Sequence, residues 1–154
     1  MSCCRTVYEC FCSLEDAIRF LWNEHPTLVA EMPATTDSTT NRFDTDGTMY
    51  GTCSHYAYLQ DVGEISSRST NIAVYGVHRY RLWIITCDKN KRDRISNYVT
   101  KTFGTCVEVN TEEGNITRIE VSRPTKSYDA EESVFLAAMN LTVSYSLRRQ
   151  CCPA

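Results

Sequence analysis

The sequence has 154 residues, a formal net charge of −3 at pH 7, 42% hydrophobic residues and 23% charged residues. These values predict one globular domain with a buried core over residues 1–154, and they exclude a disordered or low-complexity protein. We expect frayed, cysteine-containing tails over about residues 1–10 and 148–154. The acidic balance gives no overall attraction to nucleic acid or acidic membranes, so such a partner would have to meet a local basic patch.

The redox state of the nine cysteines depends on the cellular compartment. The first residues, MSCCRTVYECFC, contain no basic segment followed by a continuous apolar stretch, so they do not resemble a secretory signal. No apolar stretch approaches the 18 residues that a membrane-spanning helix needs. We therefore predict a cytoplasmic or nuclear protein whose cysteines are reduced thiols.

The first half of the chain predicts one helix and two strands. Ser13 and Asp16 form a capping box for a helix that ends at His25-Pro26. Residues 33–48 are polar and predict a long loop. A strand over residues 54–60, a polar turn through residues 66–69 and a β-rich run over residues 72–86 follow, and Gly76 suggests a bulge or break in that run.

The second half predicts two more helices around a hairpin. A helix over residues 91–103 precedes two strands, residues 106–110 and 116–121, that flank a turn. A last helix is expected from Asp129, with Glu132 completing its capping box. The order α-β-β-α-β-β-α predicts an α+β fold, with a mostly antiparallel four-stranded sheet and helices packed on one face. The other face of that sheet would be free to bind a partner.

One short motif contains two aspartates. Residues 43–48 read Phe-Asp-Thr-Asp-Gly-Thr, which resembles the nucleophile loop of haloacid-dehalogenase-type phosphatases. That resemblance implies that one of Asp44 and Asp46 attacks phosphorus and the other handles the proton, with Mg²⁺ bound. The motif is also similar to the end of the LAGLIDADG homing-endonuclease helix. The alternative is a solvent-exposed turn in which both aspartates accept backbone hydrogen bonds.

A second set of residues has the chemistry of zinc ligands. Cys53 and His55 are two residues apart on a predicted strand, so their side chains would point to the same face. Pairing of that strand with the one carrying His78 could bring three zinc ligands together. The alternative is that these residues lie in the core or at an interface.

Basic residues gather on the β-rich run and at the start of the second helix. Alternation places Arg79 and Arg81 on one face of their strand and the intervening tyrosine on the other. With Lys91, Arg92 and Arg94 they could form a surface for RNA. The alternative is a solvated helix end beside an exposed strand.

The C-terminus ends in Arg-Arg-Gln-Cys-Cys-Pro-Ala, which formally fits a prenylation motif. It is similar to the Cys-Cys-x-x ends of prenylated small GTPases. That resemblance implies weak lipid anchoring through Cys151 or Cys152, and a frayed tail is the alternative.

No catalytic set in the sequence is complete, so our leading hypothesis is a non-catalytic protein that binds a protein or RNA partner. It would be a viral or accessory factor that engages a host macromolecule and needs no cofactor. One alternative is a metal-dependent phosphoester hydrolase or nuclease using Asp44 and Asp46 with Mg²⁺. The others are an RNA-binding domain and a zinc site at Cys53, His55 and His78.

Overall fold

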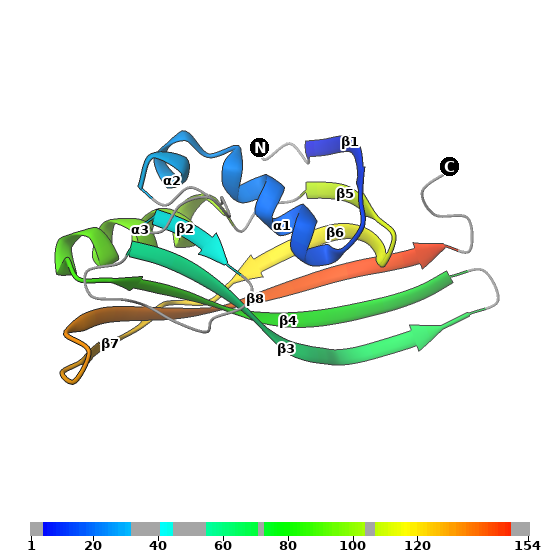
Figure 1. The fold of residues 1–154 in the computed structure, drawn as a ribbon. Helices are drawn as coiled ribbons and strands as arrows, with labels where there is room; N and C mark the ends of the chain where they lie inside the picture. The colour runs from blue at the N-terminus through cyan, green and yellow to red at the C-terminus, as the bar shows by residue number, and fades with distance from the viewer. Residues whose placement is uncertain (1–4, 32–40, 45–54, 71–72, 104–106, 149–154) are drawn as a thin grey trace.

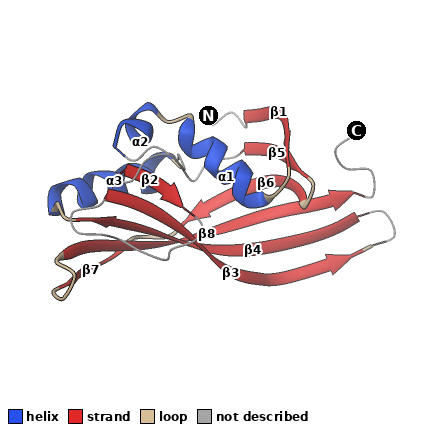
Figure 2. Ribbon diagram, viewed as in Figure 1, coloured by secondary structure: helices blue, strands red, loops and turns tan. Residues whose placement is uncertain are grey.

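The computed structural model describes residues 5–31, 41–44, 55–70, 73–103 and 107–148. These residues form three helices and eight strands (Figures 1 and 2). The helices are α1 (Leu14–Asn23), α2 (Pro26–Glu31) and α3 (Lys89–Thr102). The strands are β1 (Arg5–Phe11), β2 (Asn41–Asp44), β3 (His55–Ser69), β4 (Ala73–Thr86), β5 (Val107–Thr111), β6 (Gly114–Val121), β7 (Thr125–Asp129) and β8 (Val134–Arg148).

All eight strands belong to one mixed sheet, in which the strand order is β1-β5-β6-β8-β4-β3-β2 and β7 also pairs with β8. The pairs β1–β5 and β2–β3 are parallel and the other pairs are antiparallel. The long strands β3, β4 and β8 form the middle of the sheet, and all three helices lie on one side of it (Figure 1). The opposite side of these three strands carries none of the described helices.

Helices α1 and α3 begin at side-chain caps, as the sequence predicts for α1. The Ser13 hydroxyl accepts a hydrogen bond from the Asp16 backbone N–H at 3.1 Å. Asp88 caps α3 in the same way, by accepting from the backbone N–H groups of Asn90 and Lys91. Each cap satisfies amide donors that a helix start leaves without partners inside the helix.

The main core lies between the helices and the sheet. Leu14, Ile18 and Trp22 of α1 are buried there, and the Trp22 ring meets the Phe103 ring edge-on at 6.2 Å. Alternate residues of β4 supply the sheet side of this core, as Tyr80, Leu82 and Ile84 do. Burial of these large side chains against a continuous sheet is the main source of stability.

The predicted four-stranded sheet is wrong, and the largest error concerns β8, which was predicted to be the last helix. Asp129 does accept hydrogen bonds from the backbone N–H groups of Glu131 and Glu132, as a helix cap would. These bonds close only a turn, and Ser133 then adopts a φ of 56°, a left-handed conformation that leads into the strand. From Val134 the chain pairs with β4.

Three other segments also differ from the predictions. β1 lies within the segment predicted to be a frayed tail, and it pairs in parallel with β5. The predicted turn over residues 66–69 is instead part of β3, which pairs with β4 as far as Ser69. Gly76 interrupts nothing, because β4 is continuous through it.

Cys10 is disulfide-bonded, so the expectation that all cysteines are reduced thiols is wrong at this position. Cys12 is an exposed free thiol. None of the described helices has the length and apolar content that crossing a membrane would require.

Candidate interaction surface

We call the sheet side that faces away from the helices the open face. Its side chains come mainly from residues 75, 77, 79, 81, 83 and 85 of β4 and the even-numbered residues 134–146 of β8, together with their partners on β3. Residues paired directly across antiparallel strands share a face, so the register fixes this assignment. Tyr80 is buried on the helix side while Arg79 and Arg81 lie on the open face, as the alternation predicts.

One end of the open face is apolar. Ile85 and Val134 are buried there, and Tyr58, Trp83 and Leu136 pack against them. The Trp83 indole N–H donates a hydrogen bond to the Gln60 side-chain oxygen at 3.0 Å, which fixes the orientation of the ring. This end therefore presents a rigid aromatic group beside aliphatic side chains.

The middle of the open face is cationic. The Arg81 guanidinium lies 5.9 Å from the centre of the Trp83 ring, within the range of a cation–π contact. A cavity of about 210 Å³ opens beside them and is also lined by Ser127 and Asn140. On the same strand, the Nε of Arg79 is buried and has no hydrogen-bond partner. A buried donor without an acceptor is unfavourable, and no described residue makes an ion pair with the Arg79 guanidinium.

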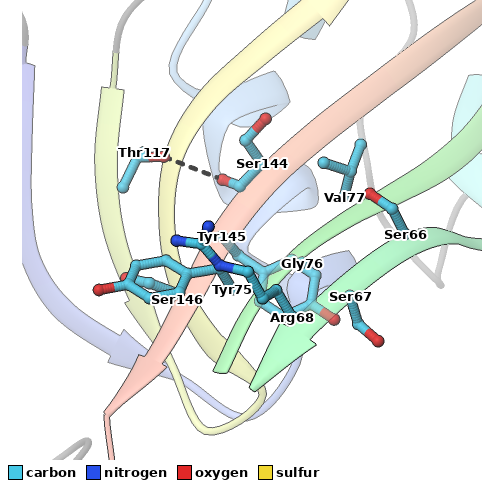
Figure 3. A pocket seen from close by; sticks show the side chains of 10 residues that line it. All are labelled: Ser66, Ser67, Arg68, Tyr75, Gly76, Val77, Thr117, Ser144, Tyr145 and Ser146. Carbon is cyan, nitrogen blue, oxygen red and sulfur yellow. Dashed lines mark hydrogen bonds between the residues drawn. The ribbon is translucent and has the colours of Figure 1, made fainter. Parts of the chain in front are cut away.

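The far end of the open face is rich in hydroxyl groups. A cavity of about 400 Å³ is lined there by residues of β3, β4, β6 and β8, whose side chains are drawn in Figure 3. Ser66, Ser144 and Thr117 contribute hydroxyls, and the Thr117 hydroxyl donates to the Ser144 carbonyl at 3.3 Å. The Arg68 guanidinium lies 5.6 Å from the centre of the Tyr75 ring, which is 44% exposed.

The opposite side of the same strands is acidic. Burial raises the pKa of Glu15, the negative charges of Asp61 and Glu113 raise it further, and Arg19 opposes the shift. Burial also raises the pKa of Tyr145 to about 12, and its hydrogen bond to Glu64 contributes to the shift. The two sides of the sheet around β3 and β4 therefore differ in the sign of their charge.

The predicted basic surface is divided by the fold, because Lys91, Arg92 and Arg94 lie on α3. Lys91 and Arg94 both make ion pairs with Glu31, at 3.6 and 3.0 Å. Arg92 is buried, donates to the Ser127 carbonyl at 3.0 Å and makes an ion pair with Asp93. These three cations have partners within the chain, and only Arg79 and Arg81 of the predicted set share the open face.

The predicted metal and catalytic residues are not assembled in the described residues. His55 begins β3, whereas His78 pairs with Glu64, nine residues further along that strand. Because Val62 is bulged out of the pairing, eight steps of about 3.3 Å separate the two positions, so the two histidines are roughly 26 Å apart along the strands, too far to share an ion. The side chain of His78 instead contacts Asp61. Within the described part of the chain, no three His, Cys, Asp or Glu residues are placed to hold a metal.

Several predicted residues cannot be placed with the others. Asp46 and Cys53 lie outside the described residues, as do Cys151 and Cys152. Asp44 ends β2, and only its backbone position is described. The phosphatase, nuclease and lipid-anchor hypotheses therefore stay predictions.

Three residues of the open face were not predicted from the sequence, namely Trp83, Arg68 and Tyr75. The period of two along β4 would place residues 75 and 83 on the same face as Arg79 and Arg81. Arg68 could not be placed without the register between β3 and β4, because residues 66–69 were expected to form a turn.

No known protein-family model matches the sequence, and no curated protein matches it either. Among solved structures, the fold is similar to a chain of the "Virion of native gene transfer agent (GTA) particle". The TM-score is 0.61 at 13% sequence identity, and the alignment covers 87% of this chain and 95% of the other. The two chains share a fold. At this identity the likeness carries no residue-level correspondence.

Proposed function

We propose that this chain is a structural, non-catalytic protein of a virus-like particle, and that it is held in the particle through its open face. The observation that carries the proposal is the fold shared with a chain of a gene transfer agent virion over nearly the whole of both chains. That coverage means that the likeness extends over most of this chain. The proposal gives the expected viral interaction protein a definite role, which is that of a structural component of a particle.

The chemistry of the open face supports a protein partner. Trp83 and Tyr75 are large aromatic groups, each beside an arginine, and these residue types are enriched where proteins bind each other. The half-buried side chains of Tyr58, Trp83 and Leu136 at one end can add hydrophobic contacts, and the hydroxyl-lined cavity at the other end can add hydrogen bonds. A partner seated here would bury the cation–π pairs and supply acceptors to the arginines.

Fractionation of the cells that encode the chain tests this proposal. A lysate would be separated by sedimentation through a density gradient, and the chain would be followed with an antibody. We expect a substantial fraction to sediment with large particles, and deletion of its gene to reduce the yield of complete particles. Recovery of the chain only in the slowly sedimenting fractions, with particle yield unchanged by the deletion, would contradict the proposal.

A matched pair of variants tests the role of the open face in the same experiment. Trp83→Ser removes the aromatic group of the open face, whereas Tyr128→Ser removes an exposed tyrosine on the helix side of β7. We expect Trp83→Ser to reduce incorporation into particles and Tyr128→Ser to leave it unchanged. Melting curves of both purified variants establish that each is folded.

A further inference from the structure

Two groups of charged residues lie on opposite sides of the sheet, around strands β3 and β4. We define the arginine row as Arg68, Arg79 and Arg81 on the open face. We define the acidic corner as Glu15, Asp61, Glu64 and Glu113 on the helix side. Alternation along the strands separates them, since Asp61 and Glu64 pair with Tyr80 and His78, whereas Arg79 and Arg81 pair with Gly63 and Gln60.

The arginine row lacks acidic partners. The guanidinium groups of Arg68 and Arg81 lie near the Tyr75 and Trp83 rings, and none of the three arginines makes an ion pair with a described residue. The Nε of Arg79 is shielded from solvent without an acceptor. A guanidinium can bind a carboxylate through two parallel hydrogen bonds, so the row is suited to receive carboxylate side chains.

The acidic corner has an excess of negative charge. Glu15 lies in the first turn of α1 and Glu113 in the turn between β5 and β6, and neither makes an ion pair with a described residue. Asp61 contacts His78, and Glu64 accepts a hydrogen bond from the Tyr145 hydroxyl. The mutual repulsion of Glu15, Asp61 and Glu113 is part of the cause of the raised pKa of Glu15. A cation from outside the chain would relieve it.

The outer edge of β3 disfavours the other common route to assembly, which is pairing of sheet edges. β2 covers β3 only over residues 55–58. Beyond that, two register shifts leave Val62 and Ile65 out of the pairing with β4, and their side chains are 52% and 49% exposed. Bulges of this kind interrupt the regular row of backbone groups that a second strand would need.

We propose that the arginine row of one copy of this chain binds the acidic corner of a second copy, so that the sheets associate front to back. The two charged groups face away from each other across one sheet, and therefore they cannot neutralise each other within a single copy. The contact is heterologous, because it joins two different surfaces. In a pair of copies, one keeps an unused acidic corner and the other keeps an unused arginine row, so further copies can add until a ring closes. This inference rests on the proposed role of the chain as an assembly protein, and it names the partner of the open face.

Sedimentation velocity of the purified full chain tests the contact at about 50 mM and about 500 mM salt, since screening weakens exposed ion pairs. We expect self-association at low salt that decreases at high salt. Arg79→Gln/Arg81→Gln and Glu15→Gln/Glu113→Gln should each weaken self-association roughly tenfold or more. Arg94→Gln, which removes an exposed cation on α3, should leave it unchanged.

A mixture of the two double variants gives the sharpest result. The arginine variant retains its acidic corner and the glutamate variant retains its arginine row, so together they should form a one-to-one dimer that does not grow. If the arginine variant does not fold, the glutamate variant reports on the same contact from the other side. A wild-type chain that stays monomeric at low salt overturns the inference, and so does self-association that survives in both variants.

A nucleic-acid partner would give a different outcome. In that case a labelled DNA or RNA oligonucleotide of mixed sequence would bind the wild type and not the arginine variant, and the wild type would stay monomeric. This result overturns the inference. A chain that sediments with particles but does not self-associate retains the proposed function without this contact. A chain that self-associates but is absent from particles retains the contact without the proposed function.

Discussion

The ring of Tyr145 lies directly over Gly76 of the neighbouring strand, where a Cβ atom would overlap it. The same ring covers Gly114 of β6, so one tyrosine of β8 fills the space left by glycines on both of its neighbours. The φ of Gly76 is not positive, so backbone conformation does not explain the glycine at this position. The close approach of the Tyr145 ring does explain it. Tyr145 and Gly76 therefore have to be considered as one packing unit.

Replacement of Gly76 by alanine should lower the free energy of unfolding by about 1–3 kcal/mol, because the added methyl group forces the Tyr145 ring out of its position. In a Tyr145→Ala background the same replacement should cost much less, since the overlapping ring is gone. Gly63→Ala is the matched control. It has open space around it but a φ of +115°, so its cost should not depend on Tyr145. Denaturant unfolding of the single and double variants measures these differences, and equal costs of Gly76→Ala in both backgrounds would refute the packing account.

The hydroxyl of Thr111 organises the turn between β5 and β6. It is buried, donates to the Gly114 carbonyl at 2.7 Å and accepts from the backbone N–H groups of Glu113 and Gly114. Thr111→Val should therefore destabilise the protein by about 1–3 kcal/mol, because buried backbone groups lose their partner. Thr117→Val, which removes an exposed hydroxyl with one bond of 3.3 Å, should change stability by less than about 0.5 kcal/mol. Thermal melts of the two variants distinguish them, and similar melting temperatures would contradict this role.

Two arginines of α3 should differ in their importance for stability. Arg92 is buried, binds the Ser127 carbonyl and lies 5.4 Å from the centre of the Phe135 ring. Arg92→Ala should cost about 1–3 kcal/mol, since it removes two of the contacts between α3 and the β7–β8 hairpin. Arg94 has a side chain that is 58% exposed and an ion pair with Glu31, so Arg94→Ala should cost about 0–1 kcal/mol. Urea titration tests the order, and a larger loss for Arg94→Ala would reverse our interpretation.

The carboxyl group of Glu15 should make stability depend on pH with a sign opposite to that of Asp93. Burial and neighbouring carboxylates raise the pKa of Glu15 above its ordinary 4.5, so the folded chain binds this proton more tightly than the unfolded chain. Stability therefore decreases as pH rises from the ordinary pKa of 4.5 through the raised pKa of Glu15 in the folded chain. The charged carboxylate then destabilises the fold at neutral pH. Glu15→Gln should raise the melting temperature near pH 7 and have little effect well below pH 4.5.

Asp93 provides the control for this pH dependence. Hydrogen bonds from Lys126 and Arg92 hold the pKa of Asp93 below its ordinary 3.8. Its contribution is present above that ordinary value and is lost as pH falls through the lowered pKa. Asp93→Asn should therefore lower the melting temperature at neutral pH. A decrease for Glu15→Gln at neutral pH would show that the sign assigned to its pKa shift is wrong.

The elements that the sequence predicts correctly have local signals. The Ser13 cap, the helix α3 and the hairpin of β5 and β6 each depend on residues within one short segment. β8 was missed because Val134, Ala138 and Leu141 have helical spacing, whereas the alternate burial of Met139, Leu141 and Val143 indicates a strand. Pairing with β4 over residues 135–148 decides between the two patterns, and such long-range pairing is not visible in a local window. β1 was missed for the same reason, since its partner β5 is about a hundred residues away.

The candidate site was predictable only in part. Alternation alone placed Arg79 and Arg81 on the outer side of β4, and the structure confirms this orientation. The expected contribution of α3 to the same surface failed because Glu31 of α2, which pairs with Lys91 and Arg94, lies near α3 only in the folded chain. Arg92 is likewise buried only once the Ser127 carbonyl of β7 lies against it. The proximity of Arg68 to Tyr75 likewise depends on the register between β3 and β4.

Hydroxyl-radical footprinting of the chain inside purified particles, compared with the isolated chain, tests the central claim most directly. Tyr75 lies on the open face and is 44% exposed, and Tyr128 lies on the helix side of β7 and is 53% exposed. These two tyrosines of similar exposure therefore report on opposite sides of the sheet. We predict that oxidation of Tyr75 decreases strongly in the particle while oxidation of Tyr128 changes little. Equal oxidation of Tyr75 in both preparations would contradict assembly through the open face.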